Sequence, residues 1–139
     1  MADPHPPKDR QPLPGKVALA RSLLFAGGGV VGLLGLLTLI SVIGDPDSAA
    51  EIAGVPASTV GAVATLYTVF GAVGIVLAAR FRTGGKVYRL GGIAWSGLGI
   101  LVGILTFPLG LLVTLAAVVA LFLLSGSEAG DWFTRAGDR

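Results

Sequence analysis

Three long stretches without a charged residue constrain the fold of this chain more than any other feature. They cover residues 22–44, 52–79 and 90–127 and hold 23, 28 and 38 residues. A transmembrane helix needs about 20 apolar residues, so each stretch is long enough to cross a bilayer. Only 13% of the residues are charged, against about 25% in soluble domains. These features exclude a soluble enzyme, a nucleic-acid-binding domain and a disordered chain.

The third stretch is too long for a single span. A helix of its 38 residues would measure about 57 Å, whereas the hydrocarbon core of a bilayer is about 30 Å thick. Pro108 and Gly110 lie near its middle and favour a tight turn. We therefore predict two spans there rather than one kinked helix.

The predicted fold is an all-α, membrane-embedded bundle of four transmembrane helices with glycine-rich packing faces. Pro46 disfavours a helical conformation of the residue before it, and Gly84 and Gly85 form a turn signal, so both positions separate spans. The predicted organisation is a Pro-rich, disordered cytoplasmic tail (1–16), a transmembrane domain (17–124) with spans at about 21–43, 59–79, 90–106 and 109–124, and a cytoplasmic C-terminal tail (125–139).

The distribution of Lys and Arg predicts the orientation. All ten lie before the first span, between the second and third, or after the fourth, whereas residues 45–51 hold three acidic residues and no basic one. Cytoplasmic loops of membrane proteins are enriched in Lys and Arg. We therefore expect a multi-pass protein of the cytoplasmic membrane with both termini in the cytoplasm.

Small residues recur at helical spacing in the first three spans. Residues 27–32 match a dinucleotide-binding pattern of glycines, but they lie inside an apolar span, where no strand precedes them. Small faces instead let membrane helices approach closely. Packing within one chain and contacts between copies of the chain both remain open. The predicted packing residues are Gly28, Gly32, Gly35, Gly71, Gly74, Gly92, Ser96, Gly99 and Gly103.

Ionisable side chains are missing from the predicted spans, apart from Arg21 at the edge of the first. Proton relays and ion-coupled transport generally need such groups inside the bundle. Resemblance to small multidrug transporters, which share this size, implies a carboxylate in the first span, and none is there. We expect no catalytic residue, no cofactor and no metal ligand. The remaining polar groups suit helix–helix hydrogen bonds at least as well as a substrate path: Thr38, Ser41, Thr65, Tyr67, Thr68, Ser96 and Thr114.

Two charged loops connect the predicted spans. The acidic loop, with Asp45, Asp47 and Glu51, matches no calcium-loop pattern and is interpreted as a solvated loop that sets the topology. The basic loop sets the topology as well, and it is also a candidate contact for anionic lipid headgroups. Its four basic residues are Arg80, Arg82, Lys86 and Arg89.

Three short motifs carry a resemblance to a known group of proteins. They are the basic turn Arg82–Arg89, the hairpin Phe107–Gly110, and Leu124–Ser127 followed by Asp131–Phe133. With these motifs the chain resembles small four-span membrane proteins of actinobacterial type, a group with no assigned function. The resemblance implies the four-helix fold and an absence of catalytic residues.

The functional hypothesis is a non-catalytic accessory, scaffold or interaction protein of the cytoplasmic membrane. The alternative is a small oligomeric transporter or pore for an apolar or uncharged permeant. The expected partners are the lipid bilayer and either further copies of the chain or another membrane protein, and no nucleic acid is expected.

Overall fold

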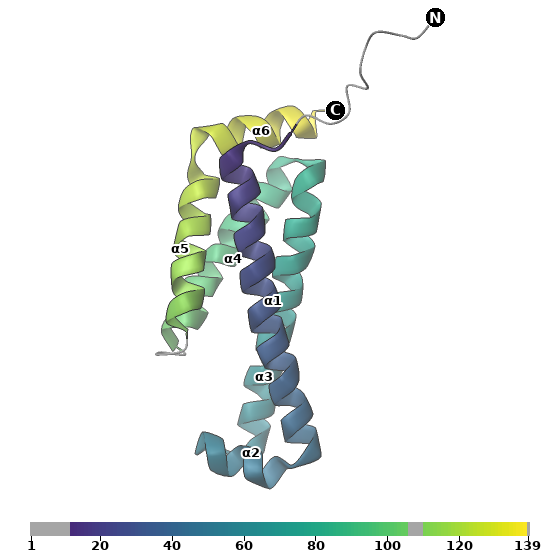
Figure 1. Ribbon diagram of the computed structural model, residues 1–139, viewed down its shortest axis with the longest axis vertical. Coiled ribbons are helices and arrows are strands. Elements are labelled where there is room, and N and C mark those ends of the chain that lie inside the picture. The colour runs from purple at the N-terminus through teal and green to yellow at the C-terminus, as the bar shows by residue number, and fades with distance from the viewer. Residues whose placement is uncertain (1–11, 106–109, 139) are drawn as a thin grey trace, which may run out of the picture.

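A computed structural model describes residues 12–105 and 110–138, and within them all regular elements are helices (Figure 1). The predicted all-α class is therefore confirmed. The elements are α1 (Gly15–Gly44), α2 (Pro46–Ala53), α3 (Ala57–Arg80), the short 3-10 helix η1 (Phe81–Thr83), α4 (Lys86–Leu105), α5 (Leu111–Ser125) and α6 (Ser127–Gly137).

Three helices are long and apolar enough to cross a membrane: α1, α3 together with η1, and α4. Each extends beyond the span predicted from hydropathy, because the helices continue through flanking charged residues such as Arg21 and Arg89. The fourth candidate is α5, which has 15 residues, taken together with α6, which is bent from it by 67°. The predicted turn at Pro108 lies outside the described residues.

The breaks between helices follow local backbone chemistry. Asp45 is extended, with φ −149°, directly before Pro46, and α1 ends there as predicted. A short helix, α2, replaces the loop expected after it and ends at Gly54, whose left-handed φ of 68° suits a helix C-cap. Gly84 and Gly85 have φ of 71° and 104°, so the predicted turn depends on conformations that favour glycine.

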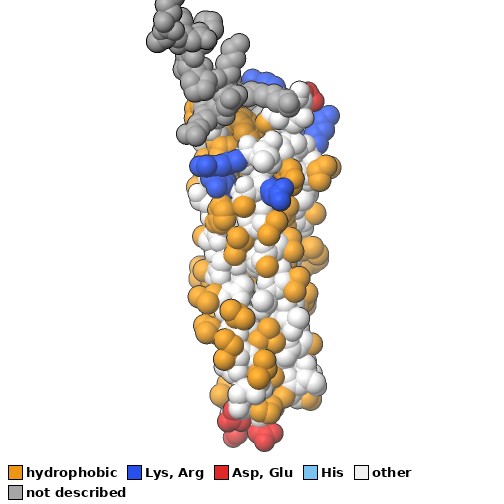
Figure 2. Space-filling model, turned by 90° about the vertical axis from the view of Figure 1, so that its right-hand side faces the viewer, with side chains coloured by type: hydrophobic (Ala, Val, Ile, Leu, Met, Phe, Trp, Pro, Cys, Tyr) orange, Lys and Arg blue, Asp and Glu red, His pale blue; other side chains and the backbone are white. Residues whose placement is uncertain are grey.

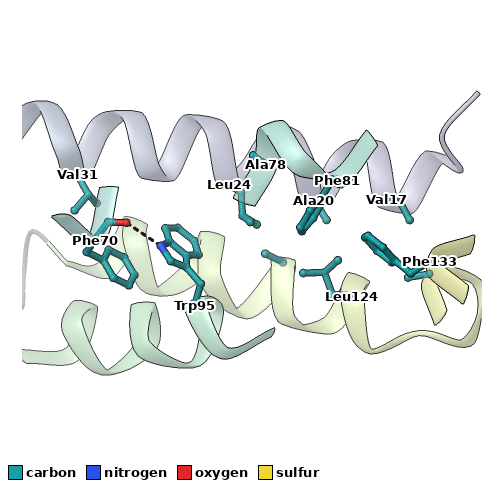
Figure 3. Packing of buried hydrophobic residues seen from close by; sticks show 12 residues of the cluster. Val17, Ala20, Leu24, Val31, Phe70, Ala78, Phe81, Trp95, Leu124 and Phe133 are labelled. Atoms are coloured by element: carbon teal, nitrogen blue, oxygen red, sulfur yellow. Dashed lines mark hydrogen bonds between the residues drawn. The ribbon is translucent and has the colours of Figure 1, made fainter. Parts of the chain in front are cut away.

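The helices associate as two antiparallel pairs. α1 lies along α3, α4 lies along α5, and α1 also contacts α5, which joins the pairs (Figure 1). A cluster of buried apolar side chains runs along the join (Figure 3). Its largest fully buried members are Phe81, Phe133, Leu24, Leu124 and Val17.

The C-terminal segment, expected to be a tail, folds into α6 and lies across one end of the bundle (Figure 1). It buries Ala129 and Phe133, and the backbone N–H of Gly85 donates to the carbonyl of Phe133 at 3.1 Å. At the other terminus α1 begins at Gly15, two residues inside the predicted tail. The long apolar helices and the C-terminal segment therefore form one packed unit.

Candidate functional site

The predicted glycine face of α1 lies against α3. A Cβ atom added to Gly28 would lie 2.8 Å from the carbonyl oxygen of Gly71, and one added to Gly35 would lie 2.6 Å from the backbone nitrogen of Thr68. A Cβ on Gly32 would meet the Cα of Gly71 at 3.4 Å. The two backbones therefore touch at these positions, as small faces allow in membrane helices.

An aromatic pair links α3 to α4 at the middle of the bundle. The rings of Phe70 and Trp95 stack with centroids 4.6 Å apart, and the indole Nε1–H of Trp95 donates to the carbonyl of Phe70 at 2.9 Å (Figure 3). A Cβ added to Gly74 would lie 2.6 Å from the Trp95 ring. The predicted small residue Gly74 thus makes room for an aromatic ring from another helix.

The small face of α4 is turned mainly toward α5. A Cβ on Gly99 would meet the Cβ of Ala117 at 3.1 Å, and one on Gly103 would lie 2.7 Å from the carbonyl oxygen of Gly110. Gly92 lies under the side chains of Leu124 and Phe81. Ser96 is fully buried, and its hydroxyl has no hydrogen-bond partner among the described residues. The predicted packing residues thus lie at contacts within one chain.

Charge lies at the two ends of the bundle, with basic side chains and some acidic ones at one end and acidic side chains at the other (Figure 2). We call the end that carries α6 the basic end, and its basic residues include Arg21, Arg80, Arg82, Lys86 and Arg89. The end that carries α2 is the acidic end, with Asp45, Asp47 and Glu51.

Two arginines of the basic end bind backbone carbonyls at helix C-termini. Nε of Arg21, on α1, donates to the carbonyl of Ala78 in α3 at 3.0 Å. Nε of Arg89, on α4, donates to the carbonyl of Leu124 in α5 at 2.9 Å. The last carbonyls of a helix lack partners within it and attract positive charge. Each helix pair is therefore fastened by an arginine of one helix at the end of the other.

The four candidate lipid-contacting residues are therefore not equivalent. Arg80, Arg82 and Lys86 are exposed. Arg89 is partly buried, and its guanidinium lies against Gly130 of α6 as well as against the end of α5. The first three are available to lipid headgroups, whereas Arg89 holds helices together.

At the acidic end, Asp45 caps α2. Its carboxylate accepts hydrogen bonds from the hydroxyl of Ser48 at 2.6 Å and from the backbone N–H of Ser48 at 3.0 Å. These bonds lower the pKa of Asp45 below its ordinary value, the hydroxyl bond having the largest effect. The acidic loop thus contains a helix N-cap of an ordinary kind.

Two cavities lie beside Tyr67, in the half of the bundle nearer the acidic end. Their volumes are about 200 Å³ and about 270 Å³, and Tyr67 and Thr38 line both. Sequence reasoning named these residues only as polar groups at membrane depth. A cavity depends on how several helices are spaced, so no local sequence pattern predicts it.

Comparison with protein-family models, curated proteins and solved structures finds no match to this chain.

Proposed function

We propose that the chain is a non-catalytic four-span protein of the cytoplasmic membrane that serves as an accessory, scaffold or interaction protein. In this proposal the basic end faces the cytoplasm, as the enrichment of Lys and Arg in cytoplasmic loops favours. α5 is the fourth span, and α6 lies along the cytoplasmic surface of the membrane.

The observation that carries the proposal is the difference between the buried and the exposed face of α6. Its buried side, with Ala129 and Phe133, packs onto the bundle. Its exposed side is polar and carries Glu128, Asp131 and Arg135. A helix held rigidly at the membrane surface with a polar outer face is suited to docking a partner, because the docking residues are ordered before binding.

The interior of the bundle supports a structural role as well. The contacts between spans are made by glycine, alanine, leucine and aromatic residues. The predicted spans contain no Asp, Glu, Lys, Arg or His apart from Arg21 at the edge of the first, and Arg21 binds a backbone carbonyl. Large apolar side chains face outward along the spans, among them Leu37, Val69, Leu101 and Phe122. These features are typical of packing inside and lipid contact outside.

The bilayer itself is the second partner in this proposal. Arg80, Arg82 and Lys86 are exposed at the basic end, where anionic headgroups would lie. Such contacts are worth about 1 kcal/mol per basic residue near the surface. In this proposal the three basic residues bind anionic lipid and also set the orientation of the protein in the membrane.

Partner capture with a charge-swapped variant tests the docking role. The protein is tagged at its N-terminus, cross-linked in its native membrane and purified in mild detergent. The swap D131R/R135E reverses two exposed charges of α6 at constant net charge, and E51K changes the acidic end as the matched control. We expect a stoichiometric unrelated membrane protein with wild type and E51K and its loss with the swap. Recovery of the protein alone, as a discrete oligomer, would contradict the docking role.

The cavities beside Tyr67 favour one second candidate, a small oligomeric transporter or pore for an apolar or uncharged permeant. Purified protein in sealed vesicles would then admit one or more uncharged solutes from a panel faster than empty vesicles do. Vesicles that stay equally tight to the whole panel would contradict this candidate.

A further inference from the structure

The two cavities share Thr38 and Tyr67 as wall residues, and the smaller one lies among α1, α2 and α3. α1 and α3 stay in backbone contact where Gly35 meets Thr68, and α4 and α5 stay in contact where Gly103 meets Gly110. The larger cavity opens between the pairs, and its wall includes residues from all four helices. They are Val31, Leu34, Thr38, Tyr67, Val102 and Val113.

The hydroxyl of Tyr67 is the unusual group in this wall. It is buried, and it has no hydrogen-bond partner among the residues that the structure describes. The hydroxyls of two neighbouring threonines donate to carbonyls one helical turn back, Thr38 to Leu34 at 2.8 Å and Thr68 to Ala64 at 2.8 Å. A buried hydroxyl without a partner is destabilising, and the Tyr67 hydroxyl retains a proton to donate.

The chemistry of the wall limits what fits there. The described lining residues of both cavities are apolar or carry a hydroxyl, and none of them is charged. Charged molecules would lose their hydration without compensation. Each cavity is smaller than the roughly 300–1,000 Å³ of ordinary ligand pockets, so the fitting molecule is slender.

We propose that the cavities beside Tyr67 bind a neutral, slender hydrocarbon-chain molecule whose carbonyl or ether oxygen accepts a hydrogen bond from the Tyr67 hydroxyl. The hydrocarbon chain fills the apolar walls, and the acceptor supplies the partner that the hydroxyl lacks. Binding of this molecule does not depend on the docking role of α6, nor on whether the molecule is carried across the membrane.

The depth of Tyr67 separates this ligand from the surrounding phospholipid. Tyr67 lies about 15 Å along α3 from its start at Ala57 and about 20 Å from Arg80, at 1.5 Å per residue. Phospholipid ester groups lie at the interface, outside the hydrocarbon core. A bulk phospholipid can place an acyl chain beside Tyr67, but the acceptor oxygen has to come from a molecule that carries it at membrane depth.

Photolabelling of the full chain in phosphatidylcholine vesicles tests this inference. The probe is a long-chain methyl ketone with a diazirine on its chain, and the comparison probe is the alkane of equal length with the same diazirine. Labelled peptides are located by mass spectrometry. We expect the ketone to label the segments around Thr38 and Tyr67 about two- to tenfold more than the alkane does, as one net hydrogen bond gives.

Three variants decide the result. Tyr67→Phe removes only the hydroxyl and should abolish the preference for the ketone, whereas Tyr88→Phe, at the basic end, should preserve it. Val113→Phe fills the larger cavity and should reduce labelling by both probes. Equal labelling of wild type by ketone and alkane would mean that an acyl chain merely fills a gap, and it would overturn the proposal. Labelling elsewhere, or a ketone preference that survives in Tyr67→Phe, would overturn it as well.

Discussion

The basic end of the bundle is built from all four long helices and α6, whereas the acidic end is built from α1, α2 and α3 (Figure 1). At the basic end Phe81, Leu124 and Phe133 fill the space between the helix pairs, and α6 covers it (Figure 3). Toward the acidic end α1 and α3 stay in backbone contact at Gly35, while one cavity remains between the pairs and a second lies among α1, α2 and α3.

This difference shows that small and large residues have separate tasks in the fold. Glycines bring two helices into backbone contact, which fixes the pairs α1–α3 and α4–α5. Large side chains then join one pair to the other, since they reach across the distance that remains. Where glycine contacts within the pairs are not supplemented by large side chains between them, a cavity remains. The candidate ligand site lies there.

Removing a large side chain should have the greatest effect, at the basic end. Phe133 is fully buried and meets Phe81 edge to face with centroids 5.3 Å apart. Phe133→Ala should cost about 3–5 kcal/mol of folding free energy, as in other packed cores. Amide exchange of α6 and of Gly85 should accelerate in Phe133→Ala. In that background Tyr67→Phe should still abolish the preference of photolabelling for the ketone. Phe122→Ala, at a position 83% exposed, is the control, and an equal loss there would contradict the role assigned to Phe133.

A methyl group between α1 and α3 should have the next largest effect. A Cβ on Gly71 would overlap the carbonyl oxygen of Gly28 and the backbone of Gly32, and backbone atoms cannot rotate away. Gly71→Ala should therefore cost about 1–3 kcal/mol, measured by denaturant titration in detergent. Gly29→Ala, with nothing within 4 Å of the new atom, should instead stabilise the helix by about 0.5–1 kcal/mol. The same sign for both variants would refute the backbone contact.

The sequence predicted the long helices better than it predicted how they are joined. Apolar length and the breaks at Pro46 and Gly84 give the long helices, because these signals are local. The helical spacing of Gly28, Gly32 and Gly35 marks a face, but not the helix that it meets. α6 was missed because residues 127–137 contain few apolar residues and become helical together with the burial of Phe133. The Tyr67 cavities depend on how several helices are spaced. No single segment of the sequence determines that spacing.

Loss of an arginine from the basic end should have a moderate effect. Arg89→Gln removes the charged donor at the end of α5, where Nε donates to the Leu124 carbonyl. Hydrogen bonds to charged groups contribute about 1.5–3 kcal/mol, and glutamine retains part of the bonding capacity, so we expect a loss of about 1–2 kcal/mol. Arg82→Gln changes an exposed arginine and should alter stability by less than about 0.5 kcal/mol. Equal effects in a denaturant titration would show that the α5 carbonyl contact is not stabilising.

Acidification should loosen α2 at the acidic end, through Asp45, and should produce the smallest change. Because the folded-state pKa of Asp45 lies below its ordinary value of 3.8, its cap on α2 is fully present above that value and is lost as the pH falls through the folded-state pKa. Ser48→Ala removes the hydroxyl bond and should raise the pKa of Asp45 toward its ordinary value. An NMR titration of the carboxyl carbon measures this shift, and amide exchange in α2 should accelerate at low pH while the amides of α6 keep their protection. If the Asp45 titration is identical in wild type and Ser48→Ala, the capping bond does not form in solution. If α6 loosens together with α2, the two ends are coupled through α1 and α3. The two ends would then not respond to pH independently, contrary to our expectation.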